Sequence, residues 1–212
     1  MDSFRREFIN SQIFNYQSKL NGLVADFGGT KKNSRSKINN NGNIDKIICI
    51  NIDKNSEADI IADLENLPIE SNYFDSFLLL EVLEHVKNPD KVLKEINRVL
   101  KKDSIGLISM PFLYQIHEAP TDFRRWTRNQ LINFFEKENF EIVSIEENGG
   151  VFAVIFDLLR SFLLKLDNRK ILIKFFVKIL KLFKPLFKFI DKKIIHLSKS
   201  ITTGYFLVLR KK

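Results

Sequence analysis

The apolar and polar positions along the chain alternate between short buried strands and amphipathic helices. Residues 74–86 read FDSFLLLEVLEHV, a nearly continuous apolar run that ends in Glu84 and His85. A run without strict alternation is typical of a parallel strand covered by helices on both faces. Side chains at the carboxyl end of such a strand lie where open α/β sheets bind ligands. This stretch therefore predicts a crevice for a nucleotide-type cofactor.

Further strands and helices follow from the same pattern. Apolar runs that end in a glycine, a proline or a charged residue predict strands at residues 23–27, 46–53, 59–63, 105–110 and 140–145. Apolar residues at helical spacing predict helices over residues 3–20, 89–102 and 129–138, the last of them capped by Thr127. Strands that alternate with helices through short connections indicate an α/β fold with a mainly parallel sheet.

Residues 151–200 interrupt this order with apolar, lysine-rich stretches. In residues 171–193 the lysines share one helical face: Lys174, Lys178, Lys181, Lys184, Lys188 and Lys192. Phenylalanine, leucine and isoleucine fill the rest, as in a helix lying in a membrane interface, and Pro185 is expected to kink or divide it. For residues 171–193 we favour contact with an anionic membrane surface. A helical hairpin packed on the domain is the alternative, favoured for residues 151–166, and a homodimer interface is a third.

The charge of the chain is concentrated in this segment. The whole sequence carries a net charge of +8, but residues 1–150 sum to −4 and residues 151–200 to +9. A nucleic-acid enzyme would more often spread basic residues over its active face, so we expect no nucleic-acid partner. The chain has one cysteine, no apolar signal core and no uncharged apolar run of about 20 residues. These features predict a cytoplasmic protein associated peripherally with the inner membrane.

A loop dense in polar and aromatic residues, HEAPTDFRRWT (residues 117–127), follows the strand at 105–110. His117 has a pKa suited to removing a proton from an acceptor, and the two arginines would hold an anionic substrate group. Alternatively, Asp122 pairs with an arginine and orders the loop. For His85 a functional and a structural role remain equally open. The candidate substrate-binding residues are His85, Glu118, Asp122, Arg124 and Arg125.

Two other kinds of chemistry find no support in the sequence. Its three histidines and its cysteine are scattered and show no metal-ligand spacing, so no metal site is expected. Nor does a nucleophile–base pair indicate hydrolysis.

Residues 23–148 resemble a class I S-adenosylmethionine-dependent methyltransferase domain. The resemblance rests on VADFGG, CINID, IIADLENLPIESNYFDSFLLLEVLEHV, PDKVLKEINRVLKKDSIGLISMP and NFEIVSIEE, in that order. It implies a Rossmann-like, seven-stranded, mainly parallel sheet with helices on both faces and an antiparallel last strand at residues 202–210. Residues 1–150 and 201–212 would then form the methyltransferase domain, with residues 151–200 as a helical insertion before its last strand.

The resemblance also implies roles for individual residues. Asp26, Gly28 and Gly29 would line the methionine end of S-adenosylmethionine, and Asp53 would hold its ribose. Asp63 and Leu64 would lie by the adenine. Glu81 would lie beside the sulfonium and the substrate, which makes Glu81 and His117 the candidate catalytic residues.

The glycine loop departs from the family's pattern. It reads DFGGTKK, with Lys31 and Lys32 where glycines are usual, so Lys31 would either crowd the cofactor's carboxylate or pair with it. Similar loops to residues 117–127 occur in methyltransferases of cell-surface polysaccharide gene clusters. We therefore expect methylation of a small-molecule or lipid-linked glycan. The rival expectation is a catalytically silent methyltransferase-fold protein that serves as a membrane-associated scaffold.

Overall fold

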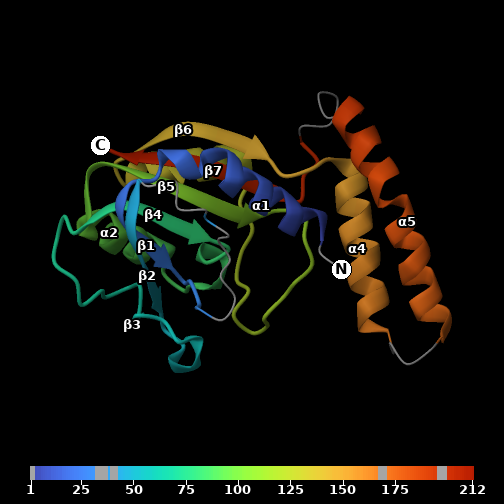
Figure 1. Ribbon diagram of the computed structural model, residues 1–212, viewed down its shortest axis with the longest axis horizontal. Coiled ribbons are helices and arrows are strands. Elements are labelled where there is room, and N and C mark those ends of the chain that lie inside the picture. The colour runs from blue at the N-terminus through green and yellow to red at the C-terminus, as the bar shows by residue number, and fades with distance from the viewer. Residues whose placement is uncertain (1–2, 32–37, 39–42, 167–170, 195–199) are drawn as a thin grey trace.

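A seven-stranded sheet forms the centre of the molecule in the computed structural model, which describes residues 3–31, 38, 43–166, 171–194 and 200–212 (Figure 1). The strand order is β3-β2-β1-β4-β5-β7-β6. The strands are β1 (Gly22–Phe27), β2 (Ile44–Asn51), β3 (Ile60–Ile61), β4 (Phe74–Leu80), β5 (Leu100–Pro111), β6 (Phe140–Glu147) and β7 (Gly204–Lys211). The pairs among β1 to β5 are parallel, whereas β7 is antiparallel to both β5 and β6. The predicted fold class is confirmed, including its antiparallel last strand.

Helices pack on both faces of the sheet. On one face, α1 (Phe4–Tyr16) buries Ile9 and Ile13 against a cluster that includes Leu78 and Phe206 of the sheet. The other face is covered by α2 (Pro89–Val99) and α3 (Arg128–Lys137), whose apolar residues join the larger core cluster. Because β4 contributes buried side chains to both clusters, its continuous apolar run has the predicted cause.

The structure moves several of the predicted boundaries, among them the ends of the strand at 46–53 and of the helix at 89–102. β2 ends at Asn51, so Asp53 lies beyond the strand, where its carboxylate caps the short helix η2 (Lys54–Ser56). The helix predicted over residues 89–102 ends at Val99, and Lys101 and Lys102 belong to β5. Both segments join elements of opposite type without a glycine or proline break, so the sequence gives no stop signal there.

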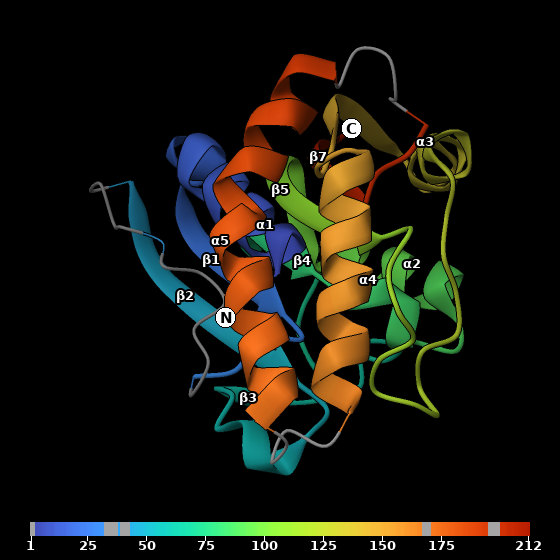
Figure 2. The same ribbon diagram turned by 90° about the vertical axis from the view of Figure 1, so that its right-hand side faces the viewer.

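Between β6 and β7 the chain forms a helical hairpin, α4 (Val151–Lys165) and α5 (Ile171–Ile194), beside the amino end of α1 (Figures 1 and 2). Phe156 of α4 packs against Phe4 of α1 and Phe187 of α5. Pro185 lies inside α5 and does not divide it. In the described part of the chain, no helix is long and apolar enough to cross a membrane.

Candidate active site

A cleft of about 510 Å³ opens at the carboxyl ends of the parallel strands. Its lining comes from the segments that follow β1, β2, β3 and β4, together with the loop after β5. The lining includes Gly28, Asn51, Asp63, Leu64, Glu81, Val82, His85, Glu118 and Thr121. This is the edge at which open α/β sheets bind ligands, and the volume falls within the range of small-molecule sites.

Close packing and hydrogen bonds shape the glycine turn after β1. Gly28 has φ +76°, and a Cβ there would lie 2.5 Å from Val82 Cγ2, so the position requires glycine. A Cβ on Gly29 would overlap the buried carboxylate of Asp26. Asn51 Nδ2 donates to the carbonyls of Gly28 (3.2 Å) and Gly29 (3.0 Å). The end of β2 thus fixes the turn.

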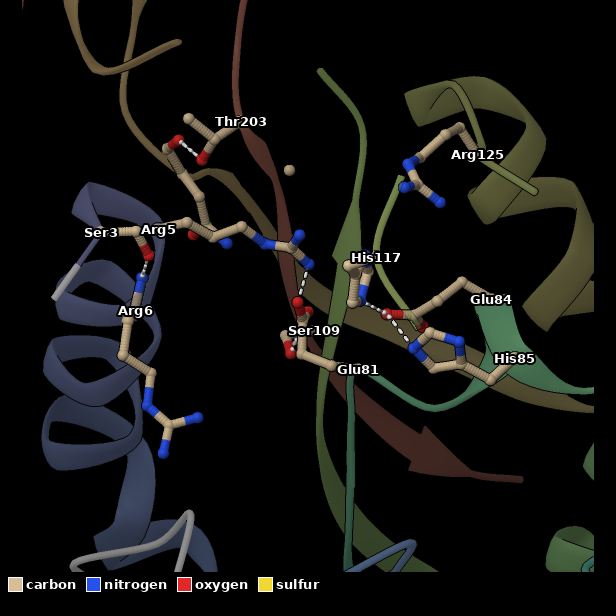
Figure 3. A network of polar contacts seen from close by, with 12 residues as sticks. Ser3, Arg5, Arg6, Glu81, Glu84, His85, Ser109, His117, Arg125 and Thr203 are labelled. Atoms are coloured by element: carbon tan, nitrogen blue, oxygen red, sulfur yellow. Dashed lines mark hydrogen bonds and ion pairs between the residues drawn. The ribbon is translucent and has the colours of Figure 1, made fainter. Parts of the chain in front are cut away.

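Glu81 marks the end of β4 and connects the cleft to α1. It has φ +59°, uncommon for a residue with a side chain, and its Oε1 accepts a hydrogen bond from Ser109 Oγ at 2.7 Å. Its carboxylate pairs with Arg5 of α1 (Figure 3). The Arg5 guanidinium lies 4.8 Å from the centre of the Tyr114 ring, and burial lowers the pKa of Arg5 to about 10.

The side chains of Glu84, His85 and His117 converge next to Glu81 (Figure 3). Glu84 is fully buried, and burial raises the pKa of its carboxyl group. Its Oε1 lies 3.7 Å from His85 Nε2 and 4.0 Å from His117 Nε2. Burial lowers the pKa of His117, which favours its neutral imidazole.

A second, smaller cavity of about 180 Å³ adjoins the first. Arg5, Tyr114 and His117 line it from one side, and it shares Glu81, His85 and Glu118 with the larger cleft. The two cavities thus meet at side chains that can carry charge.

The comparisons with known proteins agree with this arrangement. Residues 30–108 match a family model described as a methyltransferase domain. Two uncharacterized proteins from Methanocaldococcus jannaschii are each 36% identical, over 85 and 93 residues, or 38% and 42% of this chain. These matches span about two fifths of the relatives' own length, 38% and 40%.

Solved structures resemble nearly the whole chain at low identity. A SAM-dependent methyltransferase from Archaeoglobus fulgidus superposes with TM-score 0.59 and 16% identity, over 97% of this chain and 94% of that one. MccD protein superposes with TM-score 0.62 and 19% identity, over 97% of this chain and 96% of that one. The chain has the class I S-adenosylmethionine-dependent methyltransferase fold. The [4+2]-cyclase SpnF shares this fold (TM-score 0.60, 16% identity, 98% and 80% covered).

The methyltransferase fold implies S-adenosylmethionine as cofactor, and most of the cleft's residues fit that group. Gly28, Asn51, Asp63 and Leu64 line the cleft at or just after the ends of β1, β2 and β3, as a cofactor bound along this edge requires. Asp53 is not part of the lining, because it lies beyond β2 and accepts the Asn55 N–H at 2.9 Å. Its predicted ribose contact stays a prediction, and Asn51 is the polar side chain that the sequence interpretation missed.

Of the two lysines in the glycine loop, the structure describes only Lys31. Lys31 pairs with Asp59 at 2.6 Å, on the rim of β2 and β3, so its charge is already matched there. Lys32, and with it most of the polar loop up to Asn43, lies outside the described residues.

The predicted substrate residues divide into two groups. His85 and Glu118 line both cavities, and the catalytic candidate His117 lies beside them in the smaller one. Asp122 and Arg125 form the internal salt bridge that was the alternative interpretation, with contacts of 2.5 and 2.8 Å, and it holds the pKa of Asp122 well below its usual range. Arg124 donates to the Lys87 carbonyl and lies over Trp126. Substrate contacts by the arginines stay predictions.

Arg5 and Glu84 were missed as site residues. Arg5 had a weak signal, because an arginine next to Phe4 and four residues before Ile9 lies on the apolar side of its helix. Glu84 ends the apolar run that predicted the crevice, but no pattern paired it with His117, which is distant in sequence.

Proposed function

We propose that this chain is an S-adenosylmethionine-dependent methyltransferase whose acceptor enters through the smaller cavity. The observation that carries the proposal is the junction of the two cavities at Glu81, His85 and Glu118. A transferase needs its donor and acceptor sites to meet at one point, with groups there that position both and manage a proton.

The residues at the junction have distinct roles in this proposal. S-adenosylmethionine, when bound, supplies a methyl group activated by a positively charged sulfur. Glu81, held by Ser109 and Arg5, places a fixed carboxylate beside that charge. Burial lowers the pKa of His117, and its Nδ1 lies 3.2 Å from Asp122 Oδ2, so we assign Nε2 as the nitrogen without a proton. That nitrogen can take up the proton of the acceptor.

Isothermal titration calorimetry with S-adenosylmethionine tests the donor site. We expect binding in the micromolar-to-millimolar range usual for enzyme substrates. Glu81→Ala should weaken it at least about tenfold, or 1.4 kcal/mol. Glu141→Gln on β6, an exposed carboxylate change, is the matched control and should bind like the wild type. Absence of binding at millimolar cofactor would refute the enzyme proposal.

For the acceptor we propose a sugar or glycolipid intermediate of cell-surface polysaccharide synthesis, reached at a membrane face. Two observations support it: the sequence of the 117–127 loop and the exposed apolar surface of the α4–α5 hairpin. That surface includes Phe162, Phe175, Phe176, Leu182, Phe183, Leu186 and Phe189, with Leu182 78% exposed. Apolar surface of this extent, next to lysines, is typical of an interfacial helix.

Liposome flotation with anionic lipid tests the membrane contact. The double change of Lys178 and Lys188 to Glu should abolish flotation, because both lysines are exposed on α5 and each contributes about 1 kcal/mol near an anionic surface. Changing Lys19 and Lys102, exposed lysines of the sheet domain, to Glu is the control with equal charge. Equal flotation of both variants and the wild type would contradict the proposal.

One of the six lysines predicted to share a face of residues 171–193 does not point to solvent. Lys184 turns toward the domain, where it pairs with Glu7 at 2.5 Å and lies over the rings of Phe4 and Phe156. The side chains of Lys174 and Lys181 lie outside the described set.

A silent scaffold with this fold is the second candidate function. The glycine loop favours it, because lysines replace the later glycines and Lys31 is engaged with Asp59. Under this alternative the chain would float with liposomes but bind no cofactor, so the two experiments together separate the candidates.

A further inference from the structure

Glu84, His85 and His117 form a cluster whose ligand-type atoms converge on one point. One atom from each side chain, a carboxylate oxygen or a ring nitrogen, lies within 4.8 Å of the other two. Figure 3 shows the two imidazoles on either side of the Glu84 carboxylate. His85 and Glu84 come from the short helix η3 (Leu83–His85) after β4, and His117 from the loop after β5. The cluster is therefore built by two neighbouring strand ends.

The Nδ1 atom of each ring lies near an oxygen acceptor. His85 Nδ1 lies 3.0 Å from the Thr121 carbonyl oxygen, which can only accept, so this nitrogen carries the proton. His117 Nδ1 lies 3.2 Å from Asp122 Oδ2, and Asp122 is itself fixed by Arg125. Both rings thus direct Nε2 toward Glu84 Oε1, at 3.7 and 4.0 Å. Histidines that bind metals are oriented in this way, by a carbonyl or carboxylate on the other nitrogen.

Glu84 supplies the independent observation. Its side chain is fully buried, and neither oxygen accepts a hydrogen bond from another residue in the described part of the chain. A buried carboxylate without such partners is costly unless a charge compensates it. The charges of Arg5 and Arg125 act on Glu84, but each of these arginines forms its ion pair with another carboxylate, Glu81 and Asp122.

We propose that Glu84, His85 and His117 bind a divalent transition-metal ion, for which Zn²⁺ is the natural probe. Imidazole nitrogen and carboxylate oxygen suit Zn²⁺ at about 2.0–2.2 Å, which places neighbouring ligand atoms about 3.3 Å apart. The separations of 3.7 and 4.0 Å from Glu84 are a few tenths of an ångström wider. The three ligand atoms as a set lie within 4.8 Å of one another, so they would close by up to about 1.5 Å when the ion binds.

Three protein ligands leave one position open, as in catalytic rather than structural zinc sites. His85 and His117 line the smaller cavity with Glu81, so the open position faces the place proposed for the acceptor. This step rests on the proposed function. An acceptor hydroxyl bound there would lose its proton to solvent more readily. Its oxygen would form the new bond to the methyl carbon, while the carbon–sulfur bond breaks and leaves its electron pair on sulfur. His117 then acts as a ligand instead of a base.

Metal content and calorimetry on the full-length chain test the site. The protein, stripped with chelator and dialysed, is titrated with Zn²⁺, and we expect one ion per chain with micromolar or tighter affinity. His117→Ala and Glu84→Gln should each lower that affinity at least 100-fold. Asp122→Asn, which removes the carboxylate beside His117 Nδ1, should lower it about 10- to 100-fold. Glu141→Gln is the control and should bind as the wild type does.

The outcomes separate this inference from the proposed function. If the chain binds Zn²⁺ but not S-adenosylmethionine, the metal site is supported and the transferase proposal is refuted. If it binds S-adenosylmethionine but not Zn²⁺, the metal site alone is refuted. Less than about 0.1 Zn²⁺ per wild-type chain, or unchanged affinity in His117→Ala, would also overturn it. Because Glu84→Gln changes a buried group, its fold is checked by near-UV circular dichroism. The more accessible His117 variant keeps the test valid if Glu84→Gln unfolds.

Discussion

Asp122 shows how one buried carboxylate orders the loop that carries His117. It accepts two hydrogen bonds from Arg125 and one from the His117 amide, at 2.9 Å, and its side chain is only 1% exposed. These contacts are made only by the ionised form. They therefore favour ionisation in the folded state, which explains the low pKa of this group.

The depressed pKa makes this contribution to stability dependent on pH. Because the folded value lies below the unfolded value of 3.8, the stabilisation is complete above about pH 4 and is lost as pH falls further. We expect Asp122→Asn to lower the free energy of unfolding at pH 7 by about 1–3 kcal/mol, and by less at pH 3. Urea unfolding at both pH values measures this difference.

Asp90→Asn is the matched control, because Asp90 pairs with Lys137 on the surface, with both side chains more than half exposed. Such pairs contribute little, so this variant should stay within about 1 kcal/mol of the wild type at both pH values. An equal loss in Asp122→Asn at pH 7 and pH 3 would contradict the account.

At the residue level, the sequence could locate groups along the chain but not always the partner of each. Gly28, Asp63, Leu64 and Glu81 were placed at strand ends by their apolar neighbours, and the cleft contains them. Glu84 and His117 are 33 positions apart in the sequence. Only the parallel pairing of β4 and β5 brings their loops together. No local pattern encodes that contact, so the expectation that no ligand set exists missed their convergence.

At the scale of elements, two helices are capped by aspartates from other helices. Asp191 of α5 accepts from the amides of Gly150, Phe152 and Ala153, at 3.2, 3.0 and 2.7 Å, at the start of α4. Asp157 of α4 accepts from the amides of Phe4 and Arg5, at 2.8 and 3.0 Å, at the start of α1. The three helices are therefore linked in series through their amino ends.

Loss of the first cap should loosen the hairpin. Asp191→Ala leaves three amides at the amino end of α4 without this acceptor, and Gly150 has no side chain to replace it. We expect the free energy of unfolding in urea to fall by about 2 kcal/mol. Glu136→Ala, an exposed carboxylate on α3, should change it by less than about 0.5 kcal/mol. Equal values for the two variants would show that the cap has no effect on stability.

The periodicity of the sequence predicted these helices but not their caps. A helix stripe shows which face is apolar, and Phe156 and Phe187 accordingly meet in the hairpin. An aspartate that caps a helix from 41 or 153 positions away has no local signature, whereas Thr127 stands directly before the helix that it caps and was found. The fold was predictable because its signals are local and periodic.

For the whole molecule, the series of caps connects the α4–α5 hairpin to the candidate site through Arg5. Asp191 fixes α4, Asp157 of α4 fixes the start of α1, and Arg5 at that start reaches Glu81 beside the cleft. The segment predicted to meet a membrane is thus also the support of an active-site cation.

A hairpin deletion tests this dependence. The two ends of the insertion are adjacent, because the Thr203 amide donates to the Asn148 carbonyl and the Asn148 amide to the Gly204 carbonyl. A short Gly-Ser linker can therefore replace residues 151–200 while β7 keeps its place between β5 and β6. We expect a folded sheet domain that no longer floats with liposomes. It should bind S-adenosylmethionine at least about tenfold more weakly, since the start of α1 loses the Asp157 acceptor and Arg5 its fixed position.

Asp157→Ala is the companion variant, because it keeps the hairpin and the Ser3 cap on α1 and removes only the contacts of Asp157. It should retain flotation and share the weaker cofactor binding, which assigns the second effect to Arg5 and not to the missing surface. Wild-type cofactor affinity in the deletion variant would mean that Glu81 does not need Arg5. The hairpin would then serve the membrane alone.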